Sequence, residues 1–178
     1  MIQVTISEFS KEFSIKKVCF TDIIGQFRIT YQDKNGVPIL ERLDENPSQR
    51  NVYSTVILVG AEYKKVAYRN YIRDSENQRL TLEDYKLVDD EFILINKSVT
   101  ELRDPDNPYE FKQSCYDGKG NLHYVSIDSE SESKRYDAEG REIDESSFSF
   151  KGFETIDHVE SHYLEEAIKK SSNINFNR

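Results

Sequence analysis

Side chains that favour extended backbone dominate this chain. Isoleucine, valine, threonine, tyrosine and phenylalanine together account for 55 of its 178 residues, whereas alanine, leucine and methionine together account for only 15. Branched and aromatic side chains lose rotamer freedom in a helix and pack well on a pleated sheet. The composition therefore predicts a mainly β protein, and the length fits a single domain that spans residues 1–178.

The alternation of apolar and polar residues indicates where the strands lie. Residues 2–6, 27–31 and 109–115 alternate in this way, which is typical of half-buried strands. Residues 56–59, Val-Ile-Leu-Val, form a continuous apolar run and predict a strand buried on both faces. Pro38 lies in the strand that returns from the turn at residues 33–36, and it favours an edge position for that strand. We expect about eight to ten antiparallel strands, arranged as a meander sheet or a partly closed barrel.

Helical periodicity occurs only near the C-terminus. The apolar residues that fall on one helical face are Ile156, Val159, Tyr163, Ala167 and Ile168. They predict one C-terminal α-helix at about residues 156–171, followed by a frayed tail at 173–178. Asp157 and Glu160 stand three residues apart and have the spacing of a capping box at the start of this helix.

A tyrosine, an aspartate and a glycine recur at similar spacing in three segments. These are Tyr31-x-Asp33-x-x-Gly36, Tyr116-Asp117-x-x-Gly120 and Tyr136-Asp137-x-x-Gly140. In such a unit we expect the aspartate to hydrogen-bond the turn backbone and the glycine to adopt the left-handed conformation. The units resemble those of tyrosine–aspartate (YD/RHS) repeat proteins and, more loosely, the hairpins of MORN-variant repeats. The resemblance implies a meander of β-hairpins, although residues 44–110 do not match it.

Two pairs of residues are candidates for metal binding or catalysis, but neither belongs to a complete sequence motif for that chemistry. His158 and His162 have the spacing of a helical zinc pair, but the order His-Val-Glu-Ser-His is not the metalloprotease motif. A third ligand would have to come from Cys115, His123 or Glu165. For nucleophilic catalysis, the candidate thiol–imidazole pair is Cys115 with His123. The sequence contains no phosphate-binding glycine loop, nucleophile elbow or calcium loop, so we expect no enzymatic activity, cofactor or metal.

The sequence also predicts the compartment. No run approaches the ~18 apolar residues of a membrane span, and residues 1–6 lack the basic and apolar regions of a signal peptide. Two cysteines, Cys19 and Cys115, do not make a disulfide framework, and each is expected to be a small buried apolar residue. These features predict a cytoplasmic protein with reduced thiols and no membrane partner.

Negative charge is concentrated in the second part of the chain. Residues 1–72 carry 10 basic and 8 acidic residues, a net +2, so the total of −9 leaves −11 for residues 73–178. Such a chain is a poor candidate for binding nucleic acid. The densest acidic positions are Asp84, Asp89, Asp90 and Glu91, and Asp128, Glu130 and Glu132. If they share one sheet face, they form an extended surface for a basic protein; the alternative is that they serve solubility. Tyr85 and Tyr124 are expected to add rigid contact area.

In size, charge, predicted location and lack of a catalytic motif, the chain is similar to small acidic bacterial immunity proteins of polymorphic toxin systems. That similarity implies a non-enzymatic protein that occludes a basic toxin or effector domain, with acidic side chains pairing with lysine and arginine of the partner. The alternative is a lipocalin-like barrel that binds a small ligand. The Gly-x-Trp signature of lipocalins is missing, because the chain has no tryptophan.

Overall fold

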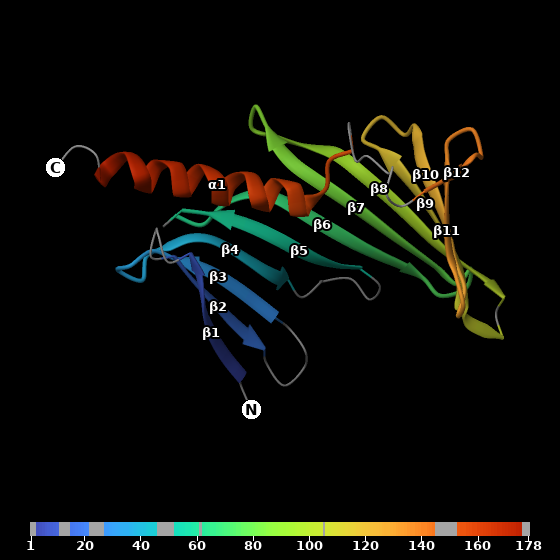
Figure 1. The fold of residues 1–178 in the computed structure, drawn as a ribbon, viewed down its shortest axis with the longest axis horizontal. Coiled ribbons are helices and arrows are strands. Elements are labelled where there is room, and N and C mark those ends of the chain that lie inside the picture. The colour runs from blue at the N-terminus through green and yellow to red at the C-terminus, as the bar shows by residue number, and fades with distance from the viewer. Residues whose placement is uncertain are drawn as a thin grey trace. The chain divides into compact units, whose positions relative to one another are not determined.

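Twelve β-strands and one helix form the part of the chain that the structure, a computed structural model, describes (Figure 1). The described residues are 3–10, 15–21, 27–45, 52–60, 62–104, 106–144 and 153–175. The strands are β1 (Gln3–Ser10), β2 (Ile15–Thr21), β3 (Phe27–Gln32), β4 (Pro38–Glu45), β5 (Val52–Val59), β6 (Lys64–Asp74), β7 (Arg79–Val88), β8 (Glu91–Asp104), β9 (Asn107–Asp117), β10 (Leu122–Asp128), β11 (Ser133–Asp137) and β12 (Glu142–Ile143), and the helix is α1 (Ile156–Asn175).

The strand order in the sheet follows the sequence from β1 to β12. This order is that of an antiparallel meander, and it confirms the predicted fold class, including the single C-terminal helix. The sheet is open, so the partly closed barrel, which was the alternative arrangement, does not form. The strand number exceeds the expected eight to ten partly because β12 has only two residues, too few to produce an alternating pattern.

The chain divides into two compact units. The first comprises β1–β4, β5 from Ser54 onward, the start of β6 and α1, and the second comprises the first two residues of β5, the rest of β6, β7–β12 and the short segment 153–155. That the two units belong to a single domain stays a prediction.

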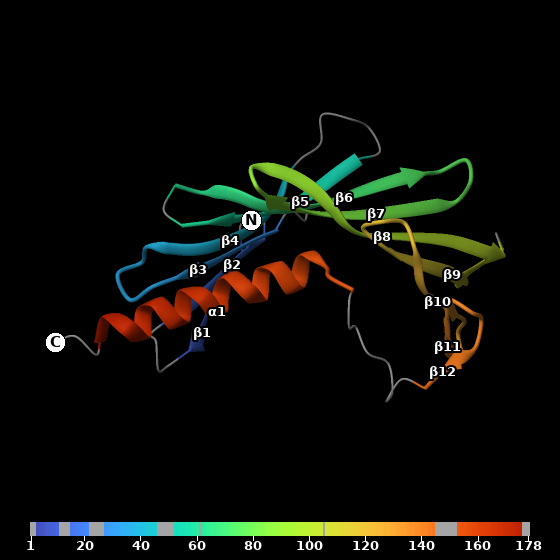
Figure 2. The same cartoon turned by 90° about the horizontal axis from the view of Figure 1, so that it is seen from above.

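In the first unit, α1 packs against β4 along one face of the strands (Figure 2). The buried apolar side chains are Ile15, Val18, Tyr31, Leu40, Val56, Ile57, Val66 and Ala67 from the strands and Ile156, Val159 and Leu164 from the helix. Val56 and Ile57 are both 0% exposed although successive strand residues point to opposite faces. The prediction that this run is buried on both faces is therefore confirmed.

Three local expectations need correction. α1 begins at Ile156 as predicted but continues to Asn175, because neither glycine nor proline follows the apolar stripe to end it. The predicted frayed tail is therefore helical up to Asn175, and residues 176–178 lie outside the described part. β4 pairs with both β3 and β5, so Pro38 marks no edge strand; it is the first residue of β4, where the missing N–H is tolerated.

The three tyrosine–aspartate–glycine units form hairpin turns with the same hydrogen bonds. In the turn after β9, the backbone N–H groups of Lys119 and Asn121 both donate to Oδ1 of Asp117, each at 2.9 Å. The N–H of Gly120 donates to the Asp117 carbonyl at 3.0 Å, and Gly120 has a φ of +85°. The same bonds form around Asp33 and Asp137. The turn mechanism expected from the sequence is therefore confirmed.

Candidate protein-docking surface

The turn between β7 and β8 carries three of the predicted docking residues. Asp89 and Asp90 are its two central residues, and Val88 pairs with Glu91 across it. Both aspartates are exposed and have left-handed φ angles of 47° and 65°, as in the type I′ turns that join tight hairpins. Sequences usually place Asn-Gly or Asp-Gly in such turns, because glycine adopts a left-handed φ without strain and Asn and Asp tolerate it better than other residues with a side chain.

The β7–β8 hairpin projects beyond the neighbouring strand β9. Pairing between β8 and β9 begins at Asn96, which lies opposite Asp117, so residues 91–95 extend past the end of β9 (Figure 1). Within this projecting part, Phe92 is 38% exposed and Ile93 is 42% exposed. Two large apolar side chains are thus exposed directly beside three acidic ones. We call residues 89–93 the hairpin tip.

The acidic side chains of the hairpin tip have no ionic partner within the described part of the chain. Asp89, Asp90 and Glu91 make no hydrogen bond or ion pair there through their carboxylates. Exposed ion pairs would lower the attraction of these charges for a partner. No described residue therefore competes with a partner's positive charges for these three carboxylates.

The second acidic cluster lies at the other end of these strands. This cluster surrounds the turn between β10 and β11 and consists of Asp128, Glu130 and Glu132. The turn comes three turns later in the meander than the hairpin tip. Successive turns of a meander alternate between the two ends of the strands, which places these two clusters at opposite ends (Figure 1). The expected single extended negative surface is therefore not formed. Glu132 lies 3.3 Å from Nζ of Lys134, and Ser126 donates a hydrogen bond of 2.6 Å to Asp128.

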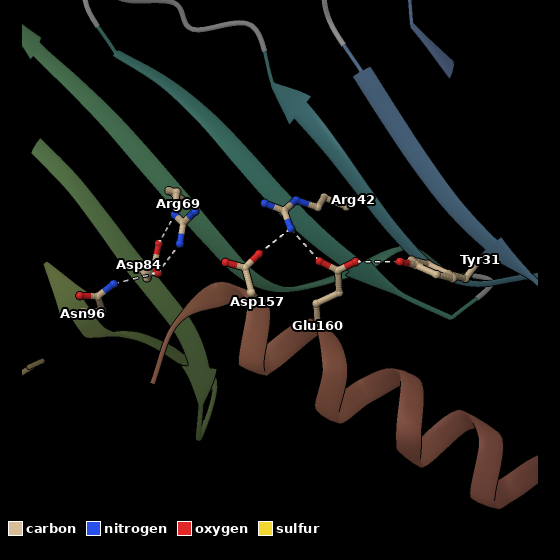
Figure 3. A network of polar contacts seen from close by, with 7 residues as sticks. All are labelled: Tyr31, Arg42, Arg69, Asp84, Asn96, Asp157 and Glu160. Carbon is tan, nitrogen blue, oxygen red and sulfur yellow. Dashed lines mark hydrogen bonds and ion pairs between the residues drawn. The ribbon is translucent and has the colours of Figure 1, made fainter. Parts of the chain in front are cut away.

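Asp84 is buried and has a structural role, so it does not belong to an exposed acidic surface. Its side chain is 0% exposed, and its carboxylate accepts hydrogen bonds from Arg69 Nε at 2.6 Å and Nη2 at 2.8 Å (Figure 3). Asn96 Nδ2 donates to the same carboxylate at 3.1 Å. The expectation that Asp84 contacts a partner is thereby corrected, because the interior of the second unit covers it. The alternating residues Leu80, Leu82 and Asp84 share one face, and this pattern was the signal that Asp84 faces inward.

The first unit holds a comparable network between the sheet and α1. Arg42 Nη1 donates to Asp157 at 2.7 Å and to Glu160 at 2.8 Å (Figure 3). The Tyr31 hydroxyl donates to Glu160 at 3.3 Å. Burial, together with the charge and hydrogen bond of Glu160, raises the pKa of Tyr31 to about 12. Asp157 and Glu160 therefore attach the helix to β4 instead of forming the expected capping box.

A third buried carboxylate belongs to Glu41, which is 2% exposed. Arg28 Nη2 donates to it at 2.6 Å and Thr30 Oγ1 at 3.1 Å. Asp84, Glu160 and Glu41 are thus each held by an arginine, which satisfies the requirement that a buried charge be paired. Sequence reasoning identified none of these pairs.

The two predicted docking tyrosines differ in their surroundings. Tyr85 is partly exposed and donates a hydrogen bond of 3.0 Å to Glu83. Tyr124 packs edge-on against Phe153 at 5.9 Å, and burial together with a hydrogen bond to Cys115 raises the pKa of its hydroxyl. Tyr124 therefore contributes mainly to the interior of the second unit. A role for either tyrosine in contact with a partner stays a prediction.

The candidate catalytic residues show no activated arrangement. His158 and His162 are both exposed, and His162 Nε2 lies 3.6 Å from Glu166. His123 stacks on Phe153 at 5.0 Å, and Cys115 is 2% exposed with a thiol pKa that burial raises. A raised pKa lowers the thiolate fraction that a nucleophile requires. Within the described ranges, no three histidine, cysteine, aspartate or glutamate side chains are placed to hold a metal ion.

Comparisons with known proteins give no relative. No protein-family model matches the chain, and no curated protein or solved structure shows significant similarity to it. In the part of the chain that the structure describes, no helix has the length and apolar character needed to cross a membrane.

Proposed function

We propose that this protein is a non-enzymatic binding protein that occludes a basic protein partner, most simply as an immunity protein that neutralises a toxin or effector domain in the bacterial cytoplasm. The observation that carries the proposal is the hairpin tip, where Asp89, Asp90 and Glu91 project past the neighbouring strand without ionic partners among the described residues.

The composition of the hairpin tip supports a protein partner. Three exposed carboxylates that lack an ionic partner among the described residues would attract lysine and arginine side chains and speed association with a positively charged surface. Phe92 and Ile93 would supply apolar contact at the centre of the interface, where most binding energy is concentrated. Asp84 takes no part in this contact, because it is buried with Arg69.

The shape of the hairpin supports occlusion as the mechanism. A projecting hairpin fits a concave site, and a concave basic site is typical of proteins that bind phosphate-rich substrates. Insertion of the hairpin tip would cover the partner's cationic residues and exclude its substrate. The left-handed φ angles at Asp89 and Asp90 support a selected role for acids at this turn, because Asn-Gly would fold there more easily.

The test uses the full chain as bait in a lysate of its native cell, at low and at moderate salt, with the captured proteins identified by mass spectrometry. The neutralised variant combines Asp89→Asn, Asp90→Asn and Glu91→Gln. We expect the wild-type chain to retain a protein of net positive charge and the variant to bind it at least about tenfold more weakly. Purified partner should lose its activity when one equivalent of the wild-type chain is added.

A matched control removes the same charge elsewhere on the surface, through Glu62→Gln, Glu76→Gln and Asp106→Asn, all at exposed positions. This control should keep the wild-type affinity. Equal loss in both triple variants would mean that only net charge matters, and the proposal for the hairpin tip would fail. Absence of any captured basic protein under both salt conditions would contradict the proposed function itself.

A further inference from the structure

The second unit contains a hollow of about 490 Å³ beside the β6–β7 turn, at the end of the strands opposite to the hairpin tip. Ligand pockets commonly measure about 300–1,000 Å³, so a small molecule would fit. Leu80, Thr100 and Leu102 line the hollow. Leu80 pairs with Thr100 across β7 and β8, and Leu102 lies two residues further along β8, so all three belong to one face of the sheet. They provide a largely apolar floor.

Arg73 is the arginine of this hollow that carries no ion pair in the described part of the chain. It lines the hollow, is exposed, and makes no ion pair or hydrogen bond with another residue in the described part of the chain. This distinguishes it from Arg28, Arg42 and Arg69, each of which holds a buried carboxylate. A guanidinium without an internal partner, next to apolar surface, is suited to bind a carboxylate of a ligand.

Neither of the two acidic residues nearby, Asp74 and Glu101, forms an ion pair with Arg73 in the described part of the chain. The Asp74 carboxylate accepts hydrogen bonds from Asn77, at 3.2 Å from the backbone N–H and at 2.7 Å from Nδ2, and is engaged within the turn. Arg79 also lines the hollow, but it pairs with Glu101 across the strands, and its Nε lies 3.9 Å from the Glu101 carboxylate, so this second guanidinium already has an acidic partner.

The rim of the hollow is fixed by backbone contacts. Gln78, which also lines it, has a left-handed φ of 50°, and its carbonyl accepts a hydrogen bond of 3.4 Å from the N–H of Leu102. This bond connects the turn to β8, and a fixed rim reduces the entropy that a ligand would lose on binding.

We propose that this hollow, the Arg73 pocket, binds a small organic carboxylate with an apolar body. The carboxylate accepts hydrogen bonds from the Arg73 guanidinium, and the apolar body covers Leu80 and Leu102. The proposal concerns a second site and does not rest on the docking function of the hairpin tip.

The experiment is a chemical-shift titration of the full-length, ¹⁵N-labelled chain with 4-phenylbutyrate. The neutral and cationic analogues are 4-phenylbutan-1-ol and 4-phenylbutylammonium. We expect saturable shifts at the amides of Gln78, Leu80 and Leu102 with the carboxylate, binding at least about tenfold weaker with the alcohol, and none with the ammonium. The comparison of the three probes uses only the wild-type chain, so it does not depend on any variant folding.

Two matched variants locate the charge that binds the probe. Arg73→Gln should weaken 4-phenylbutyrate binding at least about tenfold. Arg103→Gln removes the same charge from an exposed residue of β8 that does not line the pocket, and it should leave the affinity unchanged. Lack of saturable shifts in the wild-type chain would overturn the proposal. Equal affinity for acid and alcohol, or an unchanged affinity in Arg73→Gln, would overturn it as well.

Discussion

Asp84 and Asp89 lie five positions apart on the same hairpin and have opposite roles. Asp84 is fully buried and holds Arg69 and Asn96 on the neighbouring strands, whereas Asp89 is exposed on a turn that projects past β9. The comparison teaches that acidic residues of this chain serve either its fold or its surface. Counting charges along the sequence cannot separate these two classes.

The largest expected effect follows from removing the buried carboxylate. Asp84→Ala removes the carboxylate that pairs with the mostly buried Arg69, and we expect the free energy of unfolding to fall by about 3–5 kcal/mol. Urea denaturation measures this change. Asp89→Ala should change the same quantity by less than about 0.5 kcal/mol, because its side chain is exposed. Similar losses in both variants would contradict the separation.

The next effect concerns the base of the projecting hairpin. A Cβ atom at Gly118 would lie 2.1 Å from the carbonyl oxygen of Leu94, so Gly118→Ala must displace the β8 backbone. We expect a loss of about 1–3 kcal/mol in unfolding free energy, measured by urea denaturation. Gly120→Ala meets no atom within 4 Å and should lose only about 1–2 kcal/mol, from its left-handed φ of +85°. An unchanged free energy of unfolding in Gly118→Ala would contradict the close contact between the turn after β9 and the Leu94 backbone.

The network in the first unit provides a further test. Glu160→Gln removes the negative charge that Arg42 and Tyr31 contact, and we expect a loss of about 1–2 kcal/mol in unfolding free energy. The same variant should lower the pKa of Tyr31 from about 12, although burial, the main cause of the shift, will keep it above 10. The pKa of Tyr31 is higher in the folded chain than its ordinary value of 10. Its contribution to the free energy of unfolding is therefore complete below pH 10 and declines as the pH rises towards 12. NMR titration of labelled tyrosine measures this pKa, and an unchanged value would contradict the contact with Glu160.

A small stabilisation should result from changes at the hairpin tip. Replacing Asp89 with Asn and Asp90 with Gly supplies the residues that a type I′ turn favours. We expect the free energy of unfolding to rise by about 0.5–1 kcal/mol in thermal or urea denaturation. Binding of the basic partner should weaken in the same variant. Loss of stability with binding unchanged would assign the tip aspartates to the fold instead of to docking.

The smallest effect concerns an aspartate in another hairpin turn. Hydrogen bonds from the Asn121 side chain and backbone lower the pKa of Asp117. This group therefore stabilises the turn above the ordinary aspartate pKa of about 3.9, and the contribution is lost as the pH falls through the lower, folded value. Asn121→Ala should raise the pKa of Asp117 towards the ordinary value, as measured by ¹³C NMR of the carboxyl group. No change would contradict the hydrogen-bonded turn.

Local patterns of the sequence were enough for the fold class and the turns. Alternation and the abundance of branched residues predicted an antiparallel sheet, because side chains alternate between the two faces of a strand. The Asp33, Asp117 and Asp137 turns were also predicted, since an aspartate and the glycine that follows it contact only their immediate neighbours. The end of α1 was misjudged, because no residue in the sequence marks it.

The candidate surface needed the tertiary structure. The sequence placed negative charge in residues 73–178. Only strand pairing showed that the hairpin tip and the second acidic cluster lie at opposite ends of the strands. Pairing also decided which acids are buried: Glu160 contacts Arg42, 118 residues earlier in the chain, and Asp84 is surrounded by neighbouring strands. The sequence by itself determined which segments are extended and where they turn, because those preferences are local. Only the tertiary structure decided which charges remain at the surface, because burial depends on contacts between distant segments.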